Sequence, residues 1–350
     1  PAVMDKTLRA KAAVACGADL VVELPTTVSL SSAEGFAAGG VGILSKLCDT
    51  LCFGAETGEA ELLMETARAL LSEDFSPLLR RELDSGKSFP AARAEALAQM
   101  GLSGEILRRP NDILAVEYCK AILELGASLV PIPLPRQGAG HGQALTETGG
   151  QFASASALRT LWQNGGADAA APYVPAEVLP LYREAFAAGQ YTDLAAAQRC
   201  QLALLRSRCA GTAPFAQVRG ISEGLEHRLE AAVRSSTTHA ELLDSLTTVR
   251  YPRARMRRLA MDAALDYSAD AFPALPPYLH LLGAQKDALP LLKAAALPVS
   301  HSLARLAEQN APCRAVVDAQ LRACDFGALC RKKPEPMGGA LRQKIIFLTK

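Results

Sequence analysis

Short apolar runs alternate with helical patterns along the first 135 residues of the chain. The apolar runs lie at residues 20–22 (LVV), 49–53 (DTLCF) and 128–133 (SLVPIP). Each is typical of a strand that is covered on both faces of a sheet. Helical spacing of apolar residues is found at residues 5–15, 31–46, 60–71, 90–100 and 112–125. This order of helices and strands predicts an α/β domain with a parallel sheet and right-handed crossovers.

The pattern changes after a glycine-rich segment at residues 137–150. Beyond the stretch GGADAAAPYVP at residues 165–175, nearly every segment up to about residue 311 is rich in Ala and Leu and has helical spacing. The run IIFL at residues 345–348 indicates one further short strand. We therefore predict an α/β domain at residues 1–165 and an all-α domain at residues 175–350.

Composition restricts the class of protein. The chain has 350 residues, enough for two domains, and 49% of them are hydrophobic, which argues against disorder. Because 37 Lys and Arg nearly balance 36 Asp and Glu, a nucleic-acid partner must contact a local basic patch. No apolar run approaches the ~18 residues of a spanning helix, and no secretory signal is visible. These features predict a cytoplasmic protein.

Nine cysteines are scattered through mostly apolar surroundings. The closest pair is Cys48 and Cys52, and no second pair of Cys or His completes a metal site with it. We therefore predict reduced thiols and no zinc site.

Three residues stand near the ends of the predicted strands. Gly54 follows the run at residues 49–53, where ligands bind in open parallel sheets, and a glycine there lets a nucleotide approach the backbone. Arg136 ends the run VPIPLPR, and a guanidinium at this edge suits phosphate binding through two parallel hydrogen bonds. Asn111 follows Pro110 and is either a ligand-facing amide or a helix cap. The alternative for Gly54 is an ordinary turn glycine, and the alternative for Arg136 is an exposed loop arginine.

A second candidate site opens the helical pattern after the glycine-rich segment. Ser154 and Ser156 stand at its start, and Arg159 follows about one turn later. Hydroxyls, free backbone N–H groups and a guanidinium at a helix N-terminus form a cradle for an anion. The alternative is that the serines only cap the helix.

Arginines cluster in the run TTVRYPRARMRR at residues 247–258. They are Arg250, Arg253, Arg255, Arg257 and Arg258, and Asp262 is the first acid after them. Such a cluster without an interleaved acid suits contact with a nucleic-acid backbone. A solvated helix face with internal ion pairs is the alternative.

Several of these segments, taken in order, resemble the tRNA(Met) cytidine acetate ligase family. The blocks that carry the resemblance are PAVMDKTLRAKAAVACGADLVVELP, SSAEGFAAGGV, DTLCFGAE, RPNDILAVEY, PLPRQGAGH, FASASALR, and SEGLEHRLEAA followed by the arginine run. Together they cover most of the chain. The resemblance implies a Rossmann-like α/β domain of the nucleotidylyltransferase type, with a parallel sheet, followed by an all-α domain.

The resemblance also implies an activity. Members of this family use ATP, with Mg²⁺, to activate acetate as acetyl-adenylate, and they acetylate the wobble cytidine of elongator tRNA(Met). The resemblance assigns ATP contacts to Gly54, Asn111 and Arg136, and it likens FASASALR to the phosphate-binding turn of related nucleotidylyltransferases. The arginines of the helical domain would then hold the backbone of the anticodon stem.

One departure concerns the H-x-G-H-type motif of the family, whose histidines stabilise charge on the reacting phosphates. None of the five histidines of this chain belongs to such a motif. Because the chain opens inside a helical pattern, we expect the first strand, that loop and its helix to precede Pro1. On this interpretation, residues 1–350 alone do not catalyse adenylation.

Two other functions stay open. One is an adenylyltransferase that joins AMP to a small phosphorylated metabolite, which leaves the arginine run without a role. The other is a non-catalytic RNA-binding protein, which the missing motif permits. The sequence determines neither the oligomeric state nor the residues that hold acetate.

Overall fold

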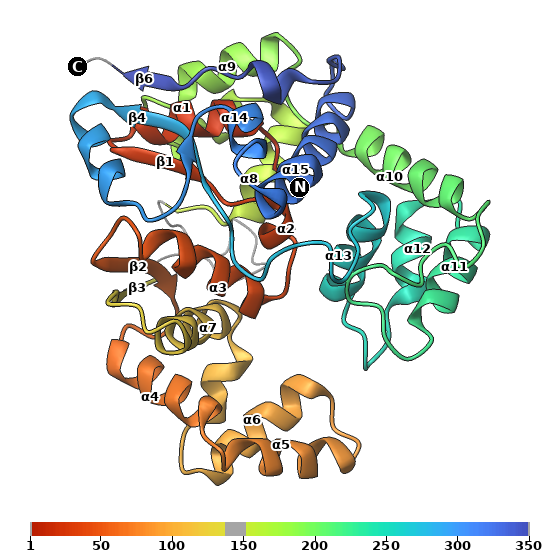
Figure 1. Ribbon diagram of the computed structural model, residues 1–350. Helices are drawn as coiled ribbons and strands as arrows, with labels where there is room; N and C mark the ends of the chain where they lie inside the picture. Colours follow the sequence, from red (N-terminus) through yellow and green to blue (C-terminus); the bar gives the residue numbers. More distant parts are fainter. Residues whose placement is uncertain (1, 137–151, 349–350) are drawn as a thin grey trace.

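A computed structural model describes residues 2–136 and 152–348 and confirms the α/β class of the chain (Figure 1). The glycine-rich segment at residues 137–150 lies outside the described residues. Two small sheets and the helices around them form the larger part of the fold, and a group of helices projects to one side (Figure 1). None of the helices in the described part of the chain combines the length and apolar character needed to cross a membrane.

The elements of the first half follow the predicted order. They are α1 (Lys6–Ala15), β1 (Leu20–Glu23), α2 (Thr26–Ser29), α3 (Ala33–Leu44), β2 (Thr50–Ala55), α4 (Ala60–Leu71), α5 (Phe75–Asp84), α6 (Phe89–Gln99), the 3₁₀ helix η1 (Gly104–Arg108), α7 (Pro110–Glu124) and β3 (Val130–Pro135). Side chains cap two of these helices: Asp5 accepts a hydrogen bond from the N–H of Leu8, and Ser32 accepts one from Gly35. Capping of this kind satisfies backbone donors that a helix N-terminus leaves free.

Strands β2 and β3 form a parallel pair in which Gly54 lies opposite Leu134. On one face of β2 the alternate residues Leu51, Phe53 and Ala55 are buried, and they belong to the core that the sheet shares with α3, α4 and α7. On β3, Ile132 and Leu134 are 42% and 54% exposed. One face of this sheet is therefore packed, while apolar side chains of β3 remain open to solvent.

The second sheet includes strands from the last quarter of the chain. Strand β1 pairs antiparallel with β4 (Leu279–Gln285), and β4 pairs in parallel with β5 (Val299–Ser300) and β6 (Ile346–Leu348). Strands β4 and β5 therefore lie in a region that was predicted to be helical, whereas β6 matches the strand predicted at residues 345–348. Strand β4 (LHLLGAQ) is buried along nearly its whole length, and the periodicity of such a run does not distinguish a buried strand from a buried helix. The proposed division at residues 165–175 consequently does not separate a sheet from helices.

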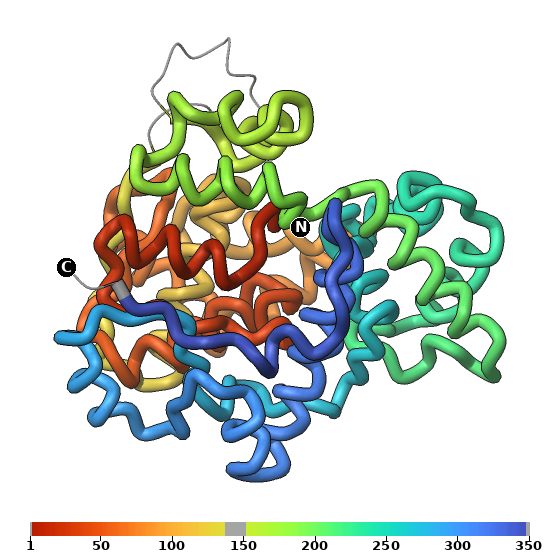
Figure 2. The backbone as a smooth tube through the Cα atoms, turned by 90° about the horizontal axis from the view of Figure 1, so that it is seen from above, coloured from red at the N-terminus to blue at the C-terminus, as the bar shows by residue number. Residues whose placement is uncertain are grey.

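The remaining elements are mainly helical. They are α8 (Ala155–Gly165), η3 (Asp168–Tyr173), α9 (Leu179–Ala187), α10 (Leu194–Arg208), α11 (Leu225–Ser235), α12 (His239–Leu246), α13 (Arg253–Ala264), η4 (Lys286–Ala294), α14 (Leu303–Ala307), α15 (Ala311–Leu329) and η5 (Gly339–Arg342). Helices α10–α13 pack around a core that includes Leu205, Leu229, Leu242 and Met256. Both views place these four helices to one side of the sheets (Figures 1 and 2). We call α10–α13 the helical unit.

Strands β1 and β2 each have one edge without a partner strand within the described residues. Across residues 2–136 and 152–348, β1 pairs with β4 alone and β2 pairs with β3 alone. One edge of each strand therefore keeps backbone N–H and C=O groups without a strand beside them, which is the usual template for adding another strand.

A buried ionic cluster ties the carboxyl end of β1 to the last part of the chain. The carboxylate of Glu23, which is 8% exposed, lies 2.9 Å from the ammonium of Lys6. It also hydrogen-bonds with Nδ1 of His280 on β4 and accepts from the amide of Gln320 on α15 at 2.9 Å. The cluster therefore joins α1, β1, β4 and α15 at one point.

This cluster predicts a loss of stability in acid. Burial acts to raise the pKa of Glu23, but the hydrogen bond with His280 and the charge of Lys6 outweigh it, and the pKa lies below its ordinary value of 4.5. The carboxylate therefore contributes stability above pH 4.5 that is lost as pH falls through the pKa of the folded state. We expect Glu23→Gln to lower the free energy of unfolding by about 1–3 kcal/mol at pH 7. Urea titrations should show this difference shrinking below pH 4.5, and a pH-independent difference would contradict the assignment.

Candidate functional site

The three residues predicted at the strand ends meet at one edge of the β2–β3 sheet. Gly54 is the penultimate residue of β2, Arg136 directly follows β3, and Asn111 is the second residue of α7. Nη1 of Arg136 lies 3.5 Å from Oδ1 of Asn111, and a Cβ placed on Gly54 would lie 3.9 Å from Cγ of Arg136. The parallel pairing of β2 and β3 explains why these residues are close together, because the carboxyl ends of parallel strands lie at the same edge of a sheet.

A reciprocal pair of carboxylates fixes the loop after β2 against the start of α7. One oxygen of Glu56 accepts from the side-chain amide of Asn111 at 2.6 Å, and the other accepts from the backbone N–H of Asp112 at 2.8 Å. In return, Oδ1 of Asp112 accepts from the N–H groups of Glu56 and Thr57, both at 2.8 Å. Because its NH₂ group is bound to Glu56, the amide of Asn111 turns its oxygen toward Arg136.

Asp112, which was not among the predicted site residues, is the central residue of this arrangement. Its side chain is fully buried, and its second oxygen accepts from the hydroxyl of Thr57 at 2.8 Å. The guanidinium of Arg109 approaches the same oxygen at 3.8 Å. A weak signal was present in the sequence, since an acid in the first turn of a helix is favoured by the free N–H groups there. Its actual partners, however, come from a loop 55 and 56 residues earlier.

A cavity of about 390 Å³ adjoins this arrangement. Its wall includes Glu56, Thr57, Leu62, Ile106 and Arg109. Apolar surface from Leu62 and Ile106 beside a few polar groups is the usual composition of a small-molecule site. Glu56 belongs both to this wall and to the network around Asn111, so the cavity lies next to that network. Among the described residues, Gly54, Asn111 and Arg136 do not line it.

The serine-rich turn adopts the capping arrangement. Ser154 is the N-cap of α8, its hydroxyl accepts from the N–H of Ala157 at 3.2 Å, and it is buried. Ser156 and Arg159 are exposed. Among residues 2–136 and 152–348, no hydrogen bond or ion pair joins this turn to Gly54, Asn111 or Arg136. Binding of phosphate by the turn stays a prediction.

The arginine run lies in α13 and the loop before it, and acids from elsewhere in the chain neutralise part of it. Arg250 hydrogen-bonds to Glu223 at 2.7 Å, and Arg253 forms an ion pair with Asp244. Asp262 is the first acid after the run, whereas the acids that pair with Arg250 and Arg253 lie before it in the sequence. Two of the five arginines therefore take the ion-paired state that was the alternative interpretation.

The other three arginines differ in exposure. The guanidinium of Arg255 stacks on the ring of Tyr251, with 5.1 Å from Cζ to the ring centroid. Burial lowers the pKa of Arg258, which is half-buried. Arg257 is exposed, and within the described residues neither Arg255 nor Arg257 forms an ion pair with an acid. These two residues are the ones most available to a phosphate backbone.

Comparison with known proteins gives a consistent result over the whole chain. The family profile described as HIGH Nucleotidyl Transferase matches residues 1–339. A tRNA(Met) cytidine acetate ligase of Acetivibrio thermocellus is 30% identical over 375 aligned residues, which cover 99% of this chain and 89% of the relative. The protein of the same name from Caldanaerobacter subterraneus subsp. tengcongensis is 32% identical over 303 residues, covering 84% of this chain and 74% of the relative.

Solved structures extend this similarity to the fold. The crystal structure of Thermotoga maritima TmcAL bound with alpha-thio ATP is 25% identical, has a TM-score of 0.86, and is matched over 99% of this chain and 89% of that chain. The apo form of the same protein has a TM-score of 0.88 at 26% identity, with the same coverage. The arrangement of both sheets and the helical unit is therefore close to that of an experimentally determined fold.

Proposed function

The chain belongs to the tRNA(Met) cytidine acetate ligase family, within the HIGH nucleotidyl transferases, and on this premise we propose its reaction. The protein is an ATP-dependent ligase that activates acetate as acetyl-adenylate and acetylates N4 of the wobble cytidine of elongator tRNA(Met) in the cytoplasm. The observation that carries the proposal is the meeting of Gly54, Asn111 and Arg136 at one sheet edge. A related protein of the same fold has been solved with alpha-thio ATP.

Each of the three residues has a role that follows from its position. Gly54 presents bare backbone at the carboxyl end of β2, so a nucleotide can approach more closely than a side chain would allow. The exposed guanidinium of Arg136 can bind a phosphate with two parallel hydrogen bonds. The amide of Asn111, held by Glu56, offers a fixed oxygen to the ribose or base.

The first step requires positioning and charge neutralisation. A carboxylate oxygen of acetate attacks the α-phosphorus of ATP, the bond to the bridging oxygen breaks, and pyrophosphate leaves with the electron pair. Arg136 would neutralise charge on the phosphates, and no protein nucleophile is needed. In the second step, N4 of cytidine attacks the acetyl carbonyl, AMP leaves, and the amine loses a proton.

Mg²⁺ would accompany the phosphates. Within the described residues, no group of three or more His, Cys, Asp or Glu side chains is arranged to hold a metal ion. Glu56 and Asp112, the nearest acids, already accept hydrogen bonds from Asn111 and from backbone N–H groups. This fits Mg²⁺, which keeps several waters and binds largely through substrate phosphates.

The H-x-G-H-type motif does not occur within residues 1–350. We propose that it belongs to a segment upstream of Pro1 that adds to the unpaired edges of β1 and β2. The unpaired edges and the exposed apolar face of β3 support this placement. The segment would bring its histidines to the carboxyl edge where Gly54 and Arg136 lie.

Exchange of labelled pyrophosphate into ATP tests the proposed reaction. We expect residues 1–350 alone to bind ATP without catalysing exchange. A longer protein that also contains the proposed segment upstream of Pro1 should catalyse exchange that depends on acetate. Propionate in place of acetate is the matched control for substrate recognition. Absence of exchange from the longer protein at saturating acetate would argue for one of the other functions, a metabolite adenylyltransferase or a non-catalytic RNA-binding protein.

For the RNA surface, we expect the double change Arg255→Ala and Arg257→Ala to weaken tRNA binding while ATP binding is unchanged. Both guanidinium groups lack an acidic partner among the described residues. Loss of two phosphate contacts should reduce the slope of log K against log salt by about two. Fluorescence anisotropy between 50 and 200 mM salt measures this slope. The control is Arg250→Ala with Arg253→Ala, whose side chains already pair with acids; an equal effect of both pairs would show that the assignment is wrong.

A further inference from the structure

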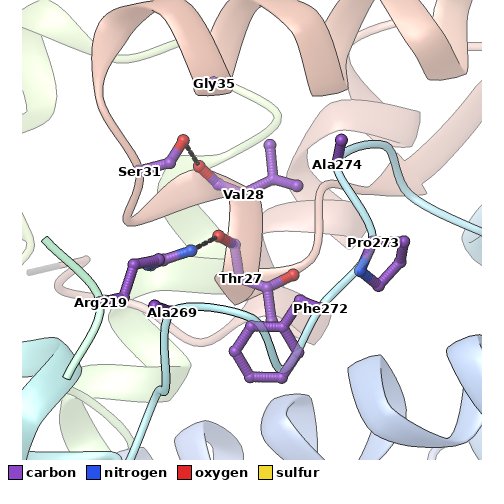
Figure 3. A pocket seen from close by; sticks show the side chains of 9 residues that line it. All are labelled: Thr27, Val28, Ser31, Gly35, Arg219, Ala269, Phe272, Pro273 and Ala274. Atoms are coloured by element: carbon purple, nitrogen blue, oxygen red, sulfur yellow. Dashed lines mark hydrogen bonds between the residues drawn. The ribbon is translucent and has the colours of Figure 1, made fainter. Parts of the chain in front are cut away.

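One guanidinium connects the helical unit to the end of β1. Nε and Nη2 of Arg219, in the loop between α10 and α11, donate to the two carboxylate oxygens of Asp262 at 2.9 Å each. Nη1 of the same side chain donates to the carbonyl oxygen of Thr27 in α2 (Figure 3). Asp262 is 4% exposed and lies near the end of α13, the helix that carries the arginine run. Arg219 therefore links α13 directly to the residues that follow β1.

A second set of hydrogen bonds strengthens the same junction. The hydroxyls of Thr26 and Tyr267 are 2.7 Å apart, and the Tyr267 hydroxyl donates to the carbonyl oxygen of Ala319 at 2.9 Å. The N–H of Thr26 donates to Oε1 of Gln320 at 2.8 Å. The guanidinium carbon of Arg219 lies 5.6 Å from the centre of the Tyr267 ring. Helix α2 is thus held by the segment after α13 and by α15 together.

A cavity interrupts the packing on one side of this junction. A cavity of about 190 Å³ separates α2 and the start of α3 from the segment at residues 269–274 (Figure 3). Thr27, Ser31, Arg219, Phe272 and Pro273 contribute to its wall. The rest of the junction is packed, because Leu265, Tyr267 and Ala319 form a buried cluster there. The hydrogen bonds of Arg219 and Tyr267 add directional contacts to this packing, and those of Arg219 lie beside the cavity.

We propose that Arg219 is a positioning residue for acetyl transfer, because it ties α13 to α2, which follows the carboxyl end of β1, and so contributes to the angle of α13 relative to the sheets. This inference rests on the proposed function. Arg255 and Arg257 are near the start of α13, whereas Asp262 is near its end. A helix of 12 residues is about 18 Å long at ~1.5 Å per residue. A tilt of roughly 10° at the junction would move its far end by about 3 Å, and misplacement of about 1 Å already slows catalysis strongly.

Arginine is the side chain that this role requires. Its planar fork binds both oxygens of Asp262 and still leaves Nη1 for the Thr27 carbonyl. Lysine has a single ammonium and cannot hold that geometry. Burial raises the pKa of Asp262, and the hydrogen bonds from Arg219 oppose this shift. Removing Arg219 alone would leave a buried carboxyl group unpaired, so a useful variant must replace both partners.

The test uses the double variant Arg219→Met with Asp262→Leu in the longer protein that contains the proposed segment upstream of Pro1. Replacing a buried ion pair with apolar side chains of similar volume preserves stability in many proteins, while here it removes the link to Thr27. We expect acetate-dependent exchange and tRNA affinity to stay within about twofold of the parent, and the single-turnover rate of acetyl transfer to fall at least about tenfold. Tyr267→Phe, which removes only the bond to Thr26 and Ala319, should lower the transfer rate in the same direction.

The matched control is Arg183→Met with Asp168→Leu, an exposed pair outside the helical unit with N and O 2.6 Å apart. All three quantities should be unchanged in this control. An unchanged transfer rate in the Arg219 variant, or a fall in proportion to tRNA affinity, would overturn the proposal. If the parent gives no acetate-dependent exchange, the proposed function fails, and the junction is then judged by a second readout.

That readout is the distance distribution between fluorophores at Glu65 on α4 and Ala254 on α13, two exposed positions of residues 1–350. Energy transfer in single molecules is expected to show a broader distribution in the Arg219→Met, Asp262→Leu variant than in the parent. Identical distributions in the two proteins would contradict the role of Arg219 in orienting α13, whatever the activity of the enzyme.

Discussion

Replacing Arg136 with alanine is expected to weaken ATP binding by about tenfold to a hundredfold and to leave tRNA affinity within about twofold. A hydrogen bond to a charged group contributes about 1.5–3 kcal/mol, and ~1.4 kcal/mol corresponds to a tenfold change in affinity. Arg136 is exposed directly after β3, so its removal leaves no buried partner without a hydrogen bond. Calorimetric titration with ATP and anisotropy with tRNA measure the two affinities separately.

Two further variants make the Arg136 test specific. Arg136→Lys should recover only part of the affinity, because an ammonium cannot form the parallel pair of hydrogen bonds. Arg108→Ala removes another exposed arginine close to the site, one that pairs with Glu105, and ATP affinity should be unchanged. If Arg136→Ala instead loses tRNA and keeps ATP, the edge of β3 belongs to the RNA surface and the assignment of the site is wrong.

Replacing Asp112 with alanine is expected to have the largest effect on stability of any single change at the site. Its fully buried carboxylate accepts from two backbone N–H groups and from the hydroxyl of Thr57. Each donor left without a partner in the interior costs about 1–3 kcal/mol, so we expect the free energy of unfolding to fall by roughly 3 kcal/mol or more. The loop that carries Glu56 should then release the Asn111 amide, and ATP affinity should fall with it.

Chemical denaturation of both proteins, with ATP titration at a temperature where the variant is folded, measures these effects. Asp84→Ala serves as the control, because Asp84 is an exposed acid at the end of α5. Asp112→Asn should lie between the parent and the alanine variant, since an amide keeps one acceptor oxygen. An unfolding free energy within 0.5 kcal/mol of the parent, the usual range of surface changes, would show that the carboxylate network does not stabilise the loop.

Local patterns were sufficient to predict the first half of the fold. The helices α1, α3, α4, α6 and α7 and the strands β1, β2 and β3 all lie where apolar spacing and short apolar runs placed them. Residues such as Asp5 and Ser154 mark helix starts through the hydrogen bonds that their own side chains accept from nearby N–H groups. Information of this kind is contained within one turn of the chain, so a single sequence reveals it.

The features that could not be predicted from local patterns depend on contacts between distant parts of the chain. Strand β4 is an apolar run without alternation, and its partner β1 lies more than 250 residues earlier in the chain. Glu223 and Asp244, which neutralise Arg250 and Arg253, belong to other segments, the loop before α11 and helix α12. The same applies to Asp112, whose role depends on a loop 55 and 56 residues away. Charge and burial at such positions are properties of the folded chain.

The most direct test of the account is a crystal structure of residues 1–350 with a non-hydrolysable ATP analogue. We predict that the nucleotide lies at the carboxyl edge of β2 and β3, with the Gly54 backbone, the Asn111 amide and the Arg136 guanidinium in contact with it. A nucleotide bound at another edge of the fold, with these three residues facing solvent, would contradict the account.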